Sequence, residues 1–314
     1  KFKVYYTIEL NEIATHIFES NDFEVKLCSH NDEETYVKEL AEFQPDAIMC
    51  RTEPITAKMM DTCKNLKVIG KQGAGLDNID MDHAHAKDIT VVYAPAGNAN
   101  AVAEHAVMLM LMCAKRFTYV DRQFRGGNFL VRMGMEHTYE LGGKTLGMIG
   151  CGRISQLAMQ KCKYGFGMNV IGYDPYLTQD KIGDLCELKA TAKEVWEQAD
   201  FVSVHLPVVP STEHSIGREQ FSWMKPTASF INCARGALIK ENELVACLQD
   251  GTLFQAGLDV FEHDPIQESS RALFDLDNVI MTPHMAATTE QSVLNCCTSV
   301  ANDIVAVCNG QEPQ

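Results

Sequence analysis

A glycine turn in the middle of the chain is the feature that most constrains the fold. Gly150-Cys-Gly152 directly follows the apolar run Thr145–Ile149, which has the length and composition of a buried strand. A strand that enters a glycine turn and then a helix forms a phosphate cradle, because the turn lets the ligand approach the backbone and the helix directs free N–H groups at the anion. The helix is expected to begin near Arg153 and Ile154. We therefore predict that Gly150, Gly152, Arg153 and Ile154 bind a dinucleotide.

An acidic residue downstream selects between the two nicotinamide dinucleotides. Asp174 lies 22 residues after Gly152, at the end of the next predicted strand, where a carboxylate accepts hydrogen bonds from the adenosine ribose. The same carboxylate would repel the 2′-phosphate of NADP, so the predicted cofactor is NAD. Ser155 stands where the pattern has its third glycine. A glycine pair alone is also compatible with a purely structural turn, and the flanking strand, helix and Asp174 favour the cofactor.

Composition and charge bound the function further. The chain has 314 residues, 46% of them hydrophobic, and a net charge of −15. The length suits two domains, and the charge argues against nucleic acid or an anionic membrane as a partner. The longest apolar run, residues 106–114, is too short to span a bilayer. The scattered cysteines and the lack of a visible signal peptide predict free thiols and a cytoplasmic protein, and no ligand spacing predicts a metal site.

Short apolar strands alternate with helical patterns along the chain, which indicates parallel α/β layers. A long helix rich in Ala, Met and Leu is expected over residues 100–125. Because the glycine turn lies in mid-chain, we predict two doubly wound parallel-sheet domains. A Rossmann NAD domain, residues 99–284, would be inserted into a flavodoxin-like substrate domain formed by residues 1–98 and 285–314. The active site is expected in the cleft between them. The expected strands are 3–6, 24–27, 47–50, 68–69, 90–93, 145–149, 169–173, 201–205, 228–232, 255–259 and 278–281.

Three charged or titratable residues follow predicted strands of the second half, where the carboxyl ends of a parallel sheet gather ligands. They are Arg235, Asp264 and His284. Reduction of a 2-oxo acid needs a cation that grips the carboxylate and polarises the carbonyl, a proton donor, and a carboxylate that keeps the donor protonated. Arginine, histidine and aspartate suit these tasks. Each also has a structural interpretation: a surface arginine, an aspartate in a turn before proline, and a histidine satisfied by its neighbours.

Five segments together resemble the D-isomer-specific 2-hydroxyacid dehydrogenase family over essentially the full length. They are residues 73–80 (GAGLDNID), 140–154, 204–212, 232–265 and 282–289. The resemblance implies an NAD-dependent dehydrogenase in which Arg235 binds the substrate carboxylate and carbonyl and His284 is the general acid/base. Asp264 stands where the family usually has glutamate. The shorter side chain would affect the rate and the pH optimum more than the type of reaction.

The resemblance also implies contacts to cofactor and substrate. Asp259 would hydrogen-bond the nicotinamide carboxamide. The loop Gly73, Ala74 and Gly75 would offer N–H groups to the substrate carboxylate, although it could also be a plain strand-to-helix turn. The helix near 100–125 resembles the family's dimer element, which implies a homodimer. Further residues expected along the cofactor are His205, Pro207, Thr212, Cys233 and Ala234.

The substrate is less well defined by the sequence. Arg51 and Lys71 follow or end strands at positions that resemble the phosphate-binding cations of phosphoglycerate dehydrogenases, and the stretch up to Asn98 is close to the same subgroup. Two cations in one pocket favour a phosphate ester over lactate. Glu53 would neutralise Arg51, however, so a smaller or apolar 2-hydroxy acid stays open. Thirty residues follow His284, and we expect no appended serine-sensing domain.

Two rival functions share the fold. A non-enzymatic NAD-sensing binding protein, like the C-terminal-binding-protein corepressors, would keep the cofactor and add a partner groove. The presence of both Arg235 and His284 favours an enzyme. A formate dehydrogenase would carry glutamine beside the histidine, where this chain has Asp264.

Overall fold

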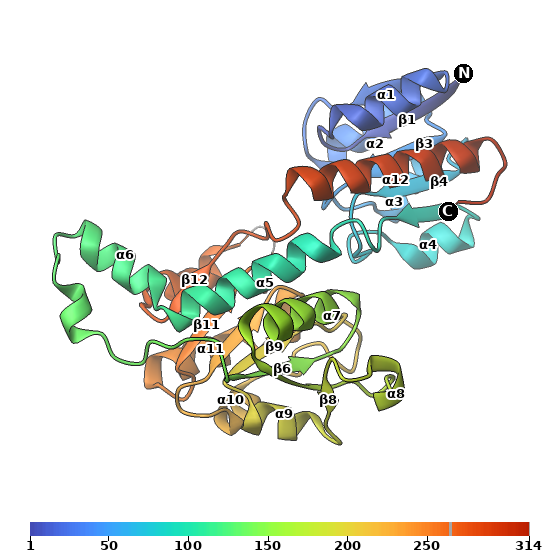
Figure 1. Cartoon of the computed structure of the whole chain (residues 1–314). Helices are drawn as coiled ribbons and strands as arrows, with labels where there is room; N and C mark the ends of the chain where they lie inside the picture. The colour runs from blue at the N-terminus through green and yellow to red at the C-terminus, as the bar shows by residue number, and fades with distance from the viewer. Residues whose placement is uncertain (264–265, 314) are drawn as a thin grey trace. The chain divides into compact units, whose positions relative to one another are not determined.

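The computed structural model describes residues 1–263 and 266–313. The chain divides into two compact units, which are coloured by residue number in Figure 1. Unit 1 consists of Lys1–Ala99 and Ala287–Gln314, and unit 2 of Asn100–Ala286. Each unit is built on its own parallel sheet, so the α/β fold with two doubly wound sheets is confirmed.

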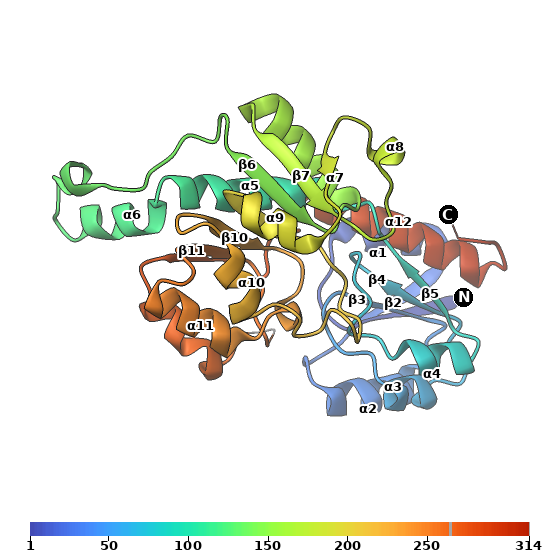
Figure 2. The same cartoon turned by 90° about the horizontal axis from the view of Figure 1, so that it is seen from below.

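Unit 1 has a five-stranded sheet in the order β2-β1-β3-β4-β5, which is the flavodoxin-like order. Helices α1 and α12 cover one face, and α2, α3 and α4 cover the other (Figure 2). The strands are β1 (Phe2–Tyr6), β2 (Phe23–Leu27), β3 (Ala47–Cys50), β4 (Val68–Lys71) and β5 (Thr90–Tyr93). The helices are α1 (Glu12–Ser20), α2 (Glu33–Phe43), α3 (Ala57–Thr62), α4 (Met81–Ala86) and α12 (Glu290–Cys308).

The central strand β1 shows why its sequence is apolar throughout. Alternate residues of a strand point to opposite faces, so Val4 and Tyr6 join the core under α1 and α12, whereas Tyr5 joins the core under α2. Phe18 of α1 is fully buried in the first of these cores, and burial of such a side chain contributes roughly 2 kcal/mol. The final helix therefore completes a core that the first hundred residues leave open on one face.

Unit 2 has seven parallel strands in the order β12-β11-β10-β9-β6-β7-β8. Six of them follow the dinucleotide-binding order, and β12 is added at the edge. The strands are β6 (Thr145–Ile149), β7 (Asn169–Tyr173), β8 (Glu187–Leu188), β9 (Phe201–Val204), β10 (Ser229–Asn232), β11 (Gln255–Leu258) and β12 (Val279–Met281). The helices are α5 (Ala99–Ala114), α6 (Phe117–Arg125), α7 (Arg153–Gln160), α8 (Gln179–Ile182), α9 (Ala192–Gln198), α10 (Arg218–Trp223) and α11 (Glu241–Asp250).

The prediction of one continuous helix over residues 100–125 is wrong, because the chain turns between α5 and α6. Arg116 adopts the left-handed conformation with φ of 50°, and its N–H donates to the carbonyl of Cys113 at 2.9 Å. Lys115 and Arg116 interrupt the apolar pattern at this point. Helix α6 buries none of its residues and extends away from the sheet of unit 2 (Figures 1 and 2).

All twelve cysteines are free thiols, as expected. Ten are buried, and only Cys28 and Cys63 are partly exposed. Across residues 1–263 and 266–313, no helix is both long and apolar enough to cross a membrane. In the same part of the chain, no cluster of three or more His, Cys, Asp or Glu side chains could hold a metal ion.

Candidate active site

The glycine turn lies where the strand order of unit 2 reverses, between β6 and β9, which is the point where doubly wound sheets bind ligands. Gly150 has a φ of 87°, a conformation that favours glycine. A Cβ atom on Gly150 would lie 2.4 Å from the carbonyl oxygen of His205, the residue after β9. The N–H of His205 donates to the carbonyl of Ile149 at 2.8 Å. Backbone conformation and close approach therefore both require glycine at position 150.

The N-terminus of α7 follows this turn and is suited to an anion. Gly152 is the residue before the helix, and no side chain caps the helix end. A Cβ atom on Gly152 would have nothing within 4 Å, so the space beside the glycine at the start of the helix is open. Ser155 is buried, and its hydroxyl donates to the carbonyl of Gly150 at 2.6 Å. The serine thus fills the place of the third glycine and ties the helix to the turn, and the site fits a dinucleotide pyrophosphate.

Asp174 follows β7 and contacts the same turn. Its Oδ2 accepts the N–H of Cys151 at 2.9 Å, and its Oδ1 accepts the N–H of Tyr176 at 2.9 Å. A carboxylate offers about four acceptor positions, so both oxygens can also accept ribose hydroxyls. The half-buried carboxylate therefore lies beside the phosphate cradle, as the spacing to Gly152 indicated.

The glycine turn gives a first testable prediction. Gly150→Ala should weaken NADH binding by about 5- to 150-fold, because strain at such a position costs on the order of 1–3 kcal/mol and the added Cβ atom would push the His205 carbonyl out of the turn. Fluorescence titration with NADH measures the effect, and thermal unfolding shows whether the variant folds. Gly134→Ala is the matched control, since a Cβ atom there meets nothing within 4 Å. An unchanged Kd for NADH in Gly150→Ala would contradict the prediction.

The loop after β9 carries three residues that the sequence assigned to the cofactor. The ring Nε2 of His205 shares a hydrogen bond of 2.9 Å with the Ser203 hydroxyl. Burial of the ring lowers the pKa of His205 to about 4, so the ring is neutral near pH 7 even though part of the residue reaches solvent. The hydroxyl of Thr212 donates to the carbonyl of Pro207 at 2.6 Å and thereby shapes the loop. Contacts of His205, Pro207 and Thr212 with the cofactor stay predictions.

The loop after β10 presents Arg235. Asn232, the last residue of β10, is fully buried. Its Oδ1 accepts the N–H of Ala234 at 2.9 Å, and its Nδ2 donates to the carbonyl of Arg235 at 2.9 Å. Sequence reasoning missed Asn232, although an amide at the end of an apolar strand is a signal for such a turn. Burial, and then the charge of Asp259, raise the pKa of the Cys233 thiol, so this thiol stays protonated.

The loop after β12 presents His284, which is exposed and has a φ of 49°, unusual for a residue other than glycine. Its N–H donates to the carbonyl of Asp259 at 2.8 Å. Asp259 follows β11 and is fully buried. The Asp259 carboxylate accepts the N–H groups of Met285 and Ala286, each at 2.9 Å. The loop that carries His284 is therefore wound around Asp259.

Two further side chains, which sequence reasoning missed, complete this network. The Thr282 hydroxyl donates to Oδ1 of Asp259 at 2.6 Å. Nε2 of His105 lies 2.8 Å from the Thr282 hydroxyl and 3.4 Å from Oδ1 of Asp259. Burial acts to raise the pKa of Asp259, but the hydrogen bonds from His105, Thr282 and the loop N–H groups outweigh it and hold the pKa below its ordinary value. The contact of Asp259 with the nicotinamide carboxamide stays a prediction.

The low pKa of Asp259 predicts how stability depends on pH. A folded-state pKa below the unfolded value of about 3.9 means that ionised Asp259 stabilises the fold. This contribution is complete above about pH 5 and is lost as the pH falls through the folded pKa. The free energy of unfolding should therefore fall less between pH 7 and pH 3 in Asp259→Asn than in the wild type. Asp180→Asn, at an exposed position, is the control.

Urea unfolding followed by tryptophan fluorescence measures this difference. Both tryptophans, Trp196 and Trp223, lie in unit 2, so the signal reports the unit that contains Asp259. An equal loss of stability in the wild type and in Asp259→Asn would show that the carboxylate does not contribute as described.

Asp264 lies outside the described residues, so its pairing with His284 stays a prediction. The segment that leads to it is described up to residue 263. A Cβ atom on Gly236 would lie 1.7 Å from the carbonyl oxygen of Phe261, so the Arg235 loop packs tightly on this segment. The buried Glu241 accepts the N–H of Glu262 at 2.9 Å and also holds the Ser270 hydroxyl. The strands β10, β11 and β12 are neighbours, so their carboxyl ends bring Arg235, Asp259 and His284 to one edge of the sheet.

In unit 1, the strand order reverses between β1 and β3. Glu53, after β3, is buried and accepts the backbone N–H of Arg51 at 2.9 Å and the hydroxyl of Thr7 at 3.1 Å. Nη2 of Arg51 donates to the hydroxyl of Thr288 at 3.0 Å. Glu53 thus holds the backbone of Arg51, whereas the guanidinium contacts a neutral side chain.

Lys71 ends β4, next to β3, and is buried. The adjacent strands therefore bring Arg51 and Lys71 to the same edge. Gly73 accepts the N–H of Ala94 through its carbonyl at 2.9 Å, and the following Ala74 and Gly75 are half-buried. Within the described residues, Oδ1 of Asn98 is buried and has no hydrogen-bond partner.

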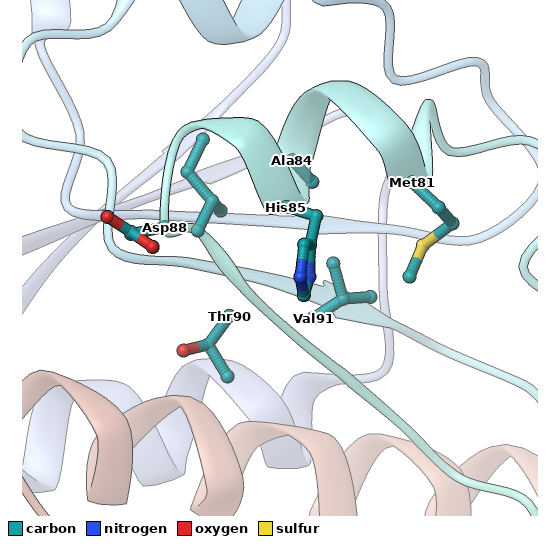
Figure 3. Close-up of a pocket in the computed structure, with 7 residues that line it drawn as sticks. Met81, Ala84, His85, Asp88, Thr90 and Val91 are labelled. Atoms are coloured by element: carbon teal, nitrogen blue, oxygen red, sulfur yellow. The ribbon is translucent and has the colours of Figure 1, made fainter.

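A separate hollow of about 350 Å³ lies in unit 1 between α4 and β5 (Figure 3). The side chains of His85, Thr90 and Met81 are among those that line it. Because Thr90 begins β5, the hollow lies at the amino end of the parallel sheet, whereas Arg51 and Lys71 lie at the carboxyl end. The hollow is therefore distinct from the residues assigned to substrate.

Comparison with known proteins adds the family. A family model described as "D-isomer specific 2-hydroxyacid dehydrogenase, NAD binding domain" matches residues 107–286, more than half of the chain. The chain belongs to this family of D-isomer specific 2-hydroxyacid dehydrogenases. Unit 2 is its NAD-binding domain, and the cofactor is NAD(H). The family predicted from the five sequence segments is confirmed.

Individual relatives are similar over nearly the whole chain. D-3-phosphoglycerate dehydrogenase from Methanocaldococcus jannaschii is 38% identical over 98% of this chain, which spans 58% of that relative's length. Hydroxypyruvate reductase from Thermotoga maritima is 35% identical, over 93% of this chain and 94% of the relative. Among solved structures, the TT0316 protein from Thermus thermophilus has a TM-score of 0.90 and 28% identity, covering 99% of this chain and 98% of that one. D-lactate dehydrogenase from Aquifex aeolicus, complexed with NAD and lactic acid, has a TM-score of 0.85 and 26% identity, with 98% and 96% covered.

Proposed function

We propose that this chain is an NAD-dependent dehydrogenase that transfers a hydride between nicotinamide and C2 of a D-2-hydroxy acid or the matching 2-oxo acid. One observation carries the proposal. Arg235 and His284 follow β10 and β12, on either side of β11, in a domain whose phosphate turn after β6 is intact. A sensor that only bound NAD would need the turn but neither of these two side chains.

The residues divide the chemistry as follows. NAD(H), when bound, supplies or accepts the hydride. The planar guanidinium of Arg235 binds the substrate carboxylate bidentately and polarises the C2 carbonyl. His284 donates a proton to the carbonyl oxygen during reduction and removes it during oxidation. Asp264 is assigned the task of orienting the imidazole.

We further infer that the substrate is a phosphorylated three-carbon acid of the 3-phosphoglycerate class. Arg51 and Lys71 supply two cations at adjacent strand ends of unit 1. The Glu53 carboxylate accepts the backbone N–H of Arg51, and the Arg51 guanidinium donates to the Thr288 hydroxyl. We assign Asn98 to the substrate as well, because its side-chain oxygen has no hydrogen-bond partner within the described residues. Several curated relatives are D-3-phosphoglycerate dehydrogenases. An unphosphorylated acid is the alternative, since the Thermotoga maritima relative is a hydroxypyruvate reductase.

Initial rates of NADH oxidation test both levels of the proposal. The substrates are 3-phosphohydroxypyruvate, hydroxypyruvate, pyruvate and 2-oxoisocaproate, each at several concentrations. A large preference for the phosphorylated acid supports phosphate binding by Arg51 and Lys71. A preference for an unphosphorylated acid refutes the phosphate assignment but keeps the reaction. No rate with any of the four refutes the proposed reaction and favours a binding role.

We also propose a homodimer formed through α5 and α6. Helix α6 and the segment after it expose large apolar side chains that unit 2 does not cover: Phe117, Phe124, Phe129, Leu130 and Met133. A surface of this kind is typical of an interface between subunits. Light scattering coupled to gel filtration measures the mass in solution, and a monomer would refute this assignment. The cytoplasmic location stays a prediction.

A further inference from the structure

We infer that His105 on α5 is a positioning residue for the catalytic loop: its imidazole N–H, acting through the Thr282 hydroxyl, fixes Asp259 and thereby His284. The inference rests on the proposed role of His284 as acid/base. His105 is not among the residues that touch substrate or cofactor in the proposal. It would act only through the hydrogen bonds that hold the loop.

The direction of each hydrogen bond in the network is determined. An ionised carboxylate only accepts hydrogen bonds, so the Thr282 hydroxyl must donate its single proton to Oδ1 of Asp259, 2.6 Å away. The Thr282 oxygen is then the acceptor toward Nε2 of His105, 2.8 Å away. His105 therefore carries a hydrogen on Nε2. The imidazole N–H thus donates to the hydroxyl, and the hydroxyl donates to the carboxylate. Reversing either hydrogen bond would leave a buried acceptor without a donor.

The register between α5 and β11 fixes the place of His105. The side chain of Gln255 donates to the carbonyl of Cys113 at 3.1 Å. A Cβ atom on Gly257 would lie 3.0 Å from the Cβ atom of Leu109. Nε2 of His105 lies 3.4 Å from Oδ1 of Asp259. Successive contacts are therefore four residues apart on α5, at positions 113, 109 and 105. On the strand side they are two residues apart, at positions 255, 257 and 259.

This match follows from the geometry of the two elements. Four helical residues rise about 6 Å, and two strand residues rise about 6.6 Å. These contacts fix one register of the helix against the strand, and the two contacts at Cys113 and Leu109 place His105 at the end of β11. Only 9% of the His105 side chain and none of the Asp259 side chain are exposed. Water therefore does not readily replace either partner.

The loop that carries His284 is held by hydrogen bonds to Asp259, which the network positions. The Asp259 carboxylate accepts the N–H groups of Met285 and Ala286, and the Asp259 carbonyl accepts the N–H of His284. These three bonds span the residue whose φ is 49°. Without the His105 N–H, the Thr282 hydroxyl and the carboxylate are free to reorient, and the loop N–H groups lose a fixed acceptor. His284 would then leave the position from which it transfers a proton.

Two substitutions separate hydrogen bonding from packing. His105→Leu removes the donor at similar volume, whereas His105→Gln keeps an N–H donor near the place of Nε2. His105→Leu should lower kcat for the preferred 2-oxo acid about 10- to 100-fold, since a displacement of about 1 Å at a catalytic group costs on the order of 100-fold. The Kd for NADH should change less than about twofold, and His105→Gln should restore most of kcat. Glu104→Gln, at the neighbouring exposed position of α5, is the control and should match the wild type.

Hydrogen–deuterium exchange provides a measurement that does not require activity. Peptides covering residues 282–288 should exchange faster in His105→Leu, because Met285 and Ala286 lose their fixed acceptor, and at the wild-type rate in His105→Gln. A wild-type protein that reduces no 2-oxo acid refutes the proposed function, and the exchange data still decide whether His105 holds the loop. Wild-type exchange in His105→Leu, or equal loss of kcat in the Leu and Gln variants, overturns the inference.

Discussion

Replacing His284 with alanine is expected to lower kcat about 100- to 10,000-fold, which is the usual contribution of a general acid or base. NADH binding should persist, because the phosphate turn and Asp174 belong to β6 and β7, whereas His284 follows β12. The proposed proton transfer therefore predicts a variant that binds cofactor and does not turn over. Steady-state rates and fluorescence titration with NADH measure the two properties separately.

A second variant removes an ambiguity in this experiment. His284 has a positive φ, which alanine adopts less readily than asparagine. His284→Asn should keep the loop in place, remove the titratable group and lose as much activity as His284→Ala. His16→Ala, at an exposed position of α1, is the control for loss of a histidine. Wild-type kcat in either His284 variant would remove His284 from the proposed mechanism.

Arg235→Lys is expected to lower kcat/KM about 100- to 1,000-fold, comparable with the loss of a donor that stabilises a developing oxyanion. Lysine keeps the positive charge, but a point charge does not reproduce the planar fork that binds a carboxylate and the adjacent carbonyl together. Both KM for the 2-oxo acid and kcat should therefore worsen. The loop itself should survive, because Asn232 holds it through the backbone of residues 234 and 235.

The matched control for this variant is Arg218→Lys. Arg218 pairs with Asp250 at 2.8 Å on the exposed side of unit 2, so its replacement should leave the kinetics unchanged. A fall in kcat/KM of less than about tenfold in Arg235→Lys would mean that the guanidinium geometry is not used, and would count against bidentate binding of the substrate.

Local patterns were enough to predict the cofactor half of the site. Gly150, Gly152 and Asp174 are linked by a strand, a turn and a spacing that lie within one stretch of chain, and the structure brings them together. The parallel sheets of both units also followed from the alternation of short apolar runs with helices, because parallel strands need a crossover between them. Roles in catalysis and binding for the individual side chains stay predictions.

Other features could not be predicted because they depend on contacts between distant segments. His105 meets Thr282 across 177 residues of sequence, and no local pattern on α5 indicates that contact. The break between α5 and α6 depends on the backbone conformation of the single residue Arg116. The spacing of apolar residues does not indicate such a conformation. The proximity of Glu53 to Arg51 in sequence also did not indicate that the carboxylate accepts the backbone N–H of that residue.

Because cysteines occur in both units, the unfolding of each unit can be followed separately by the reactivity of its own thiols. Unit 1 contains Cys28, Cys50, Cys63, Cys296, Cys297 and Cys308, and unit 2 contains the other six. In the folded chain, a maleimide pulse should label Cys28 and Cys63 first, because the remaining thiols are buried. Under mild denaturant, the buried thiols become accessible only when their surroundings unfold locally or globally. Mass spectrometry of labelled peptides would thus show whether the two sheets melt together or one after the other, without any introduced probe.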